Sequence, residues 1–102
     1  MKDFLSIDID STLVNGAVFA ILSDGLPEFS WRQGDSDAQG TYVSGRNPDG
    51  VNIQCWTGEQ PMLMSVSFRS AKDFPEEARD HLLSRLLTEL IPCIGRVGKF
   101  DG

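Results

Sequence analysis

The chain has 102 residues, 40% of them hydrophobic and 24% charged, which is typical of one small globular domain. Nine Lys and Arg against fifteen Asp and Glu give a formal net charge of −6. This balance argues against a general affinity for nucleic acid or anionic lipid, because basic residues drive both kinds of binding.

The first two predicted elements are a strand and a helix. Apolar and polar residues alternate over residues 5–10, which is the period of a half-buried strand and turns Asp8 and Asp10 away from the core. Ser11 then stands where a helix N-cap belongs, and apolar residues recur at helical spacing over residues 13–22.

Four segments with a period of two follow, and they predict an antiparallel meander. They are residues 29–32, 41–46, 51–57 and 62–69. We expect a polar, flexible loop at Gly34–Gly40. A tight turn is expected at Asn47-Pro48-Asp49-Gly50, where Pro and Gly occupy the positions that such a turn favours.

A long helix comes next. Asp73 followed by Glu76 predicts a capping box at its start, and Pro92 is expected to stop it. Leu86 lies in the middle of its apolar side. The apolar residues after the helix predict a short final strand or a packed tail: Ile94, Val97 and Phe100.

Together these elements predict the α+β class. The expected fold has two layers, an antiparallel sheet of four to five strands with two amphipathic helices on one face. The other face of the sheet is expected to be open toward solvent or a partner.

One short motif looks like catalytic chemistry. Asp8-Ile9-Asp10-Ser11-Thr12 follows an apolar run and resembles the opening Asp-x-Asp-x-Thr motif of haloacid dehalogenase-type phosphatases. The resemblance implies that Asp8 attacks a phosphoryl group and that Asp10 is the general acid, around one Mg²⁺. Such sites also need a lysine and a later acidic pair on a parallel sheet. Here Gly34-Asp35-Ser36-Asp37 comes before Lys72, and the predicted meander is antiparallel, so we prefer the interpretation of two solvent-facing carboxylates.

The other reactive side chains give no catalytic, metal or cofactor site. His81 is the only histidine and lies on the polar side of the last helix. Cys55 shares its parity with Val51 and Ile53, so we expect an inert thiol in the core. Cys55 and Cys93 show no Cys-x-x-Cys spacing, and both are expected to be reduced.

The sequence also predicts a location. The N-terminus lacks the pattern of a signal peptide, and no run approaches the roughly 18 apolar residues of a membrane span. We therefore expect a single cytoplasmic domain over residues 1–102 that does not enter a membrane.

The predicted open face of the sheet gathers residue types that are enriched at protein interfaces, namely Trp, Tyr and Arg. The candidate binding residues on it are Arg32, Tyr42, Arg46, Gln54, Trp56 and Arg69. We expect Trp56 to stand near Arg46 and Arg69. The acidic loop residues Asp35 and Asp37 form a second candidate contact. Aromatic and Arg side chains on a sheet also stack single-stranded RNA in some modules, but the excess of acid disfavours RNA here.

These observations predict a small, acidic, non-enzymatic protein-binding module. The first hypothesis is an inhibitor or immunity-type protein that occludes a basic partner, such as a toxin, a nuclease or a nucleic-acid-binding protein. Complementary charge would speed that encounter. The second hypothesis is a chaperone for a secreted effector, which a homodimer burying a helix or sheet face would favour. The Mg²⁺-dependent phosphatase using Asp8 and Asp10 is third.

Overall fold

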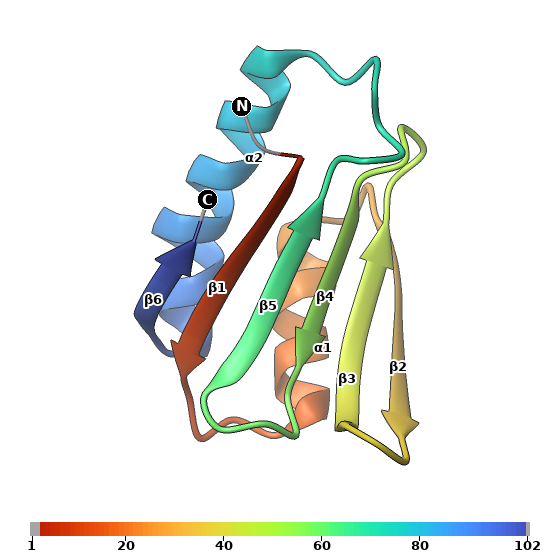
Figure 1. Cartoon of the computed structure of the whole chain (residues 1–102). Coiled ribbons are helices and arrows are strands. Elements are labelled where there is room, and N and C mark those ends of the chain that lie inside the picture. Colours follow the sequence, from red (N-terminus) through yellow and green to blue (C-terminus); the bar gives the residue numbers. More distant parts are fainter. Residues whose placement is uncertain (1–2, 102) are drawn as a thin grey trace.

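The computed structural model describes residues 3–101, and these form one antiparallel sheet with helices (Figure 1). The strand order in the sheet is β2-β3-β4-β5-β1-β6. The strands are β1 (Phe4–Asp10), β2 (Ser30–Ser36), β3 (Gly40–Arg46), β4 (Asn52–Trp56), β5 (Met62–Ser67) and β6 (Arg96–Asp101). The α+β class and the antiparallel sheet are confirmed. The expected number of four to five strands is wrong, because the described residues contain six.

Two helical regions accompany the sheet. The first is α1 (Asn15–Gly25), and the second runs without a break through α2 (Glu76–Arg85), the π-helical segment η1 (Leu86–Leu90) and α3 (Ile91–Ile94). In the view of Figure 1 both regions lie behind the sheet. Buried strand residues such as Ile7, Ile53 and Met64 share one hydrophobic cluster with Leu22 and Leu86 of the helices.

The additional strand is β6, which pairs with β1 at one edge of the sheet. Its two apolar residues, Val97 and Phe100, lie opposite Ile9 and Ile7. They are three residues apart instead of two because the register shifts by one residue beside Gly98. This bulge breaks the period of two, so the sequence alone predicts either a short final strand or a packed tail.

Both expected helix starts are wrong. Ser11 does not cap α1, which begins four residues later after Val14. The Ser11 hydroxyl instead donates a hydrogen bond of 2.6 Å to the carbonyl of Ile94 and accepts one from the Leu13 amide. Asp73 makes no capping bond either, since α2 begins at Glu76 directly after Pro75.

Pro92 does not stop the last helix but lies inside α3. Proline lacks an amide hydrogen, and its ring crowds the carbonyl of the residue four positions earlier. The π-helical turn at η1 comes immediately before and widens the helix at this point. We attribute the continuation of the helix past Pro92 to this wider turn, which relieves the crowding.

The loop expected from Gly34 to Gly40 is shorter in the structure: only residues 37–39 form a turn, because β2 continues to Ser36 and β3 begins at Gly40. Gly34 lies opposite Tyr42, and the Tyr42 ring covers it so closely that an added Cβ would stand 2.3 Å from that ring. Trp31 covers Gly45 in the same way, with an added Cβ 2.4 Å from its ring. An aromatic side chain thus covers each of these strand glycines.

Candidate protein-binding face

Side chains alternate between the two faces of the sheet, and this alternation defines a face that points away from the core. Val43, Cys55 and Met64 are fully buried, whereas their strand neighbours Tyr42 and Trp56 are only half-buried. We call the side of the sheet that carries Tyr42 and Trp56 the outer face. Trp56 was expected on this face, opposite in parity to Cys55, and the burial pattern of β4 agrees.

Three apolar side chains form a continuous strip across the outer face, and we call Tyr42, Trp56 and Leu63 the aromatic strip. The Tyr42 and Trp56 rings lie with their centroids 5.3 Å apart and an interplanar angle of 60°. Leu63 stands directly opposite Trp56 on β5. Tilted rings at this spacing interact favourably beyond the area that they bury.

A hydrogen-bond network holds the end of β4 that carries Trp56. The Thr57 hydroxyl donates to the side-chain oxygen of Asn15 at 2.6 Å and lies 2.8 Å from the Thr41 hydroxyl. The Asn15 amide donates in turn to Gln33 at 3.2 Å. The network joins α1, β2, β3 and the end of β4, so side-chain hydrogen bonds to three other elements hold the backbone beside the aromatic strip.

The arginine side chains do not surround Trp56 as expected. Arg46 lies opposite Asn52, four residues along β4 from Trp56, which corresponds to about 13 Å at the rise of a strand. Arg69 follows β5 and stacks on Phe4, with its guanidinium 5.0 Å from the ring centroid. The expectation that Trp56 stands near Arg46 and Arg69 is wrong, since the strand register places them at opposite ends of the face.

The remaining polar candidates lie between these ends. Arg32 is exposed and stands opposite Ser44, and Gln54 lies between Ser44 and Ser65 in the same row across the sheet. The face therefore has three rows: an arginine end with Arg46 and Arg69, a middle row that begins at Arg32 and continues with amide and hydroxyl groups, and the aromatic strip.

The two acidic candidates do not belong to this face. Asp35 lies on the same side of β2 as Trp31, whose ring packs toward the core, and it stands opposite Thr41 on β3. Asp37 lies in the turn between β2 and β3. Both are exposed, and both lie at the end of β2 where that strand turns into β3.

Asp8 and Asp10 stand on β1, which has antiparallel neighbours on both sides. Asp8 lies opposite Lys99 and Asp10 opposite Arg96. Lys72 follows β5, whose last residue Ser67 is opposite Phe4, so Lys72 lies at the far end of β1 from Asp10. The structure thus does not bring Lys72 to Asp8 and Asp10, although the phosphatase site would need it there. Among residues 3–101, no three His, Cys, Asp or Glu side chains gather as a metal site would require.

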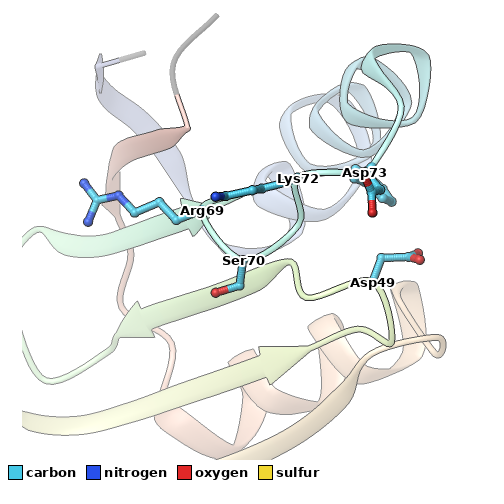
Figure 2. A pocket seen from close by; sticks show the side chains of 6 residues that line it. Asp49, Arg69, Ser70, Lys72 and Asp73 are labelled. Carbon is cyan, nitrogen blue, oxygen red and sulfur yellow. The ribbon is translucent and has the colours of Figure 1, made fainter.

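A hollow of about 390 Å³ lies at the arginine end of the sheet and carries both signs of charge (Figure 2). Arg69 and Lys72 extend along one side of it in the view of Figure 2, and Asp49 and Asp73 lie on the other side. The mixture of charges favours no single kind of small ligand.

His81 is exposed on α2, as predicted. Cys55 is fully buried, also as predicted, and burial raises the pKa of its thiol from 9.0 to about 12. Such a thiol is not a nucleophile near neutral pH. Cys93 is exposed, and both cysteines are free.

Comparison with known proteins assigns no family. No protein-family model matches the chain, and no curated protein matches it. No helix within residues 3–101 has the length and apolar character needed to cross a membrane.

Sequence reasoning missed the residues that hold the aromatic strip in place. The sequence predicts a loop at Gly34, and the hydrogen bond between Thr57 and Asn15 joins residues 42 positions apart. The sequence did contain one indication that Gly34 lies in a strand. Trp31 and Gln33, which precede it, stand at the alternate positions of the predicted strand before it.

Proposed function

We propose that this protein is a non-enzymatic protein-binding module that acts by covering a surface of its partner, as an inhibitor or immunity-type protein does. The proposal places the helices on one face of the sheet and the binding surface on the outer face. The two free thiols support a reducing compartment such as the cytoplasm.

The observation that carries this proposal is the aromatic strip. Tyr42, Trp56 and Leu63 lie side by side on the sheet, each is partly accessible, and none contributes to the buried core. Trp and Tyr are the residue types that most often anchor protein interfaces. The supporting network around Thr57 lowers the cost of ordering this surface on binding.

The expectation of a basic partner concerns the helical side of the protein and not the outer face of the sheet. Carboxylates are frequent on the helical regions and the loops that join them, for example Glu28, Glu77 and Glu89. A basic partner surface would therefore approach this acidic side. The chaperone and homodimer hypotheses stay predictions.

Substitution of Trp56 tests the proposal. We expect Trp56→Ala to weaken the complex with a partner isolated from the native lysate by about 2 kcal/mol or more, because a buried anchor is lost. Lys72→Ala is the matched control, since Lys72 is exposed and lies outside the outer face. Binding by calorimetry, with unfolding in urea measured in parallel, separates the two roles. Equal affinity of Trp56→Ala and wild type would contradict the proposal.

A further inference from the structure

Charge is distributed unevenly over this acidic protein. The outward positions of β2–β5 carry no carboxylate, although the chain contains fifteen Asp and Glu. The outer-face charges on these strands are the guanidinium groups of Arg32 and Arg46. Arg69 follows at the end of β5. The outer-face carboxylates of β1, Asp8 and Asp10, each stand opposite a cation on β6.

We propose that the outer face binds an acidic segment of a partner protein. This inference rests on the proposed function and names the chemistry of the bound segment. Arg32 lies opposite Ser44, and Arg46 lies two residues further along β3, so the two side chains are diagonal neighbours on one face. Within the described part of the chain, no carboxylate forms a salt bridge with either of them. Two arginines this close together, without an ion pair to any carboxylate of the described residues, suit one or two carboxylates of a ligand.

The three rows of the outer face determine the order of the side chains along the bound acidic segment. Carboxylates would meet Arg32 and Arg46, and an aromatic or aliphatic side chain would contact the aromatic strip. Arg46 and Trp56 lie about 13 Å apart along the strand direction, which an extended chain spans in about four residues. The Gln54 side chain and its serine neighbours in the middle row can donate and accept hydrogen bonds between these two ends.

A nucleic acid would also present negative charge to this face. The net charge of −6 opposes it, because a polyanion would be repelled by the rest of the molecule, and three arginines neutralise few phosphates. A short acidic segment feels mainly the local charge of the face, since charges further away than about 8 Å are screened at physiological salt. The peptide is therefore the favoured ligand, and RNA is an outcome that the test distinguishes.

The test uses three hexapeptides titrated into the full-length protein enriched in ¹⁵N. The first is acetyl-Glu-Glu-Ser-Ser-Phe-Leu-amide, and the other two replace both glutamates by Gln or by Lys. Peptide concentrations up to about 5 mM suffice, because a contact between one short peptide and this face is expected to have a dissociation constant on the order of 1 mM. We expect the Glu peptide to shift the Trp56 indole signal and the amides of β3 and β4 in a saturable way. The Gln peptide should bind at least about fivefold more weakly and the Lys peptide more weakly still.

A charge reversal locates the contact. Arg46→Glu should weaken binding of the Glu peptide about tenfold or more, whereas Ser84→Glu combined with Thr88→Glu, which changes the net charge equally on the exposed side of the helical region, should change it less than about twofold. Arg32→Glu is the second variant if Arg46→Glu does not give a folded spectrum.

Four results would overturn the inference. They are equal binding of the Glu and Gln peptides, no saturable shift with the Glu peptide, preference of the outer face for the Lys peptide, and tighter binding of an eight-residue oligouridylate than of the Glu peptide. If the Lys peptide bound more tightly and still shifted the Trp56 indole signal, the ligand of the outer face would not be acidic. The outer face itself would remain the proposed binding surface. Loss of partner binding in Trp56→Ala is a separate measurement, so the two proposals can fail independently.

Discussion

Adding one methyl group at Gly34 tests the structure of the aromatic strip. A Cβ at this position would stand 2.3 Å from the Tyr42 ring and its hydroxyl, a distance that real Cβ atoms do not show. Tyr42 must therefore move in Gly34→Ala, and its contact with Trp56 must change with it. The backbone at Gly34 does not have a positive φ, so the methyl group itself causes the effect.

The size of the effect follows from where Tyr42 can go. Inserting a methyl group into a well-packed site costs about 1 to 3 kcal/mol. Tyr42 is only half-buried and can turn toward solvent, so we expect a value near the lower end, about 1 kcal/mol. Gly45 is buried beneath the Trp31 ring, which also donates a 2.9 Å hydrogen bond to the Leu26 carbonyl. Gly45→Ala should therefore cost more, about 2 to 3 kcal/mol.

Gly16 provides the matched control, because nothing lies within 4 Å of an added Cβ there. Gly16→Ala in α1 should stabilise the protein by about 0.5 to 1 kcal/mol, since alanine favours helix more than glycine does. Urea unfolding gives the three free energies, and near-ultraviolet circular dichroism reports the environment of Tyr42 and Trp56. If Gly34→Ala unfolded like wild type and kept the wild-type aromatic signal, the close contact between Tyr42 and Gly34 would be refuted.

The other predictions concern the core, the cysteines and the supporting network. Leu86→Ala should lower the free energy of unfolding by about 2 to 5 kcal/mol, because Leu86 is fully buried and its loss leaves a cavity; an unchanged melting temperature would contradict this. Cys93 should react with an alkylating reagent in the native protein and Cys55 only after unfolding, as mass spectrometry can show; rapid labelling of Cys55 would mean that it is accessible. The pKa of Cys55 is raised in the folded state, so its contribution to stability should be complete below pH 9.0 and decline as the pH rises toward 12. Cys55→Ala should lack that part of the pH dependence, and an identical profile in both proteins would argue against it. Thr57→Val should cost about 1 kcal/mol or more by leaving Asn15 without its donor, and a double-mutant cycle with Asn15→Ala should show coupling between the two residues.

Regular alternation of side chains was enough to predict most of the sheet. It located β1, β3, β4 and β5, and it placed Cys55 inside and Trp56 outside, because one face of each strand is buried and the period of two is therefore strict. The same parity already implied that Arg32 and Arg46 share the outer face, although their distance from Trp56 depends on the register.

Several of the errors occurred where a residue contacts another strand or helix. Ser11 looks like a helix cap, but its hydroxyl bonds to Ile94, 83 residues away. Gly34 looks like part of a loop until the Tyr42 ring is seen to cover it. The alternation in β6 is interrupted by the register shift beside Gly98. Local propensity contains no information about such contacts, which explains why these elements were assigned wrongly or left open.

The most direct test of the binding surface is site-specific photocrosslinking in the native lysate. One variant carries a photoreactive amino acid in place of Gln54, two residues from Trp56 on the outer face, and the other carries it in place of Glu89, an exposed residue of the helical region. We predict a single crosslinked protein from position 54, absent from position 89, and reduced by Arg46→Glu in the same chain. Crosslinking of the same partner from position 89 and not from position 54 would show that the protein binds through its acidic helical side instead.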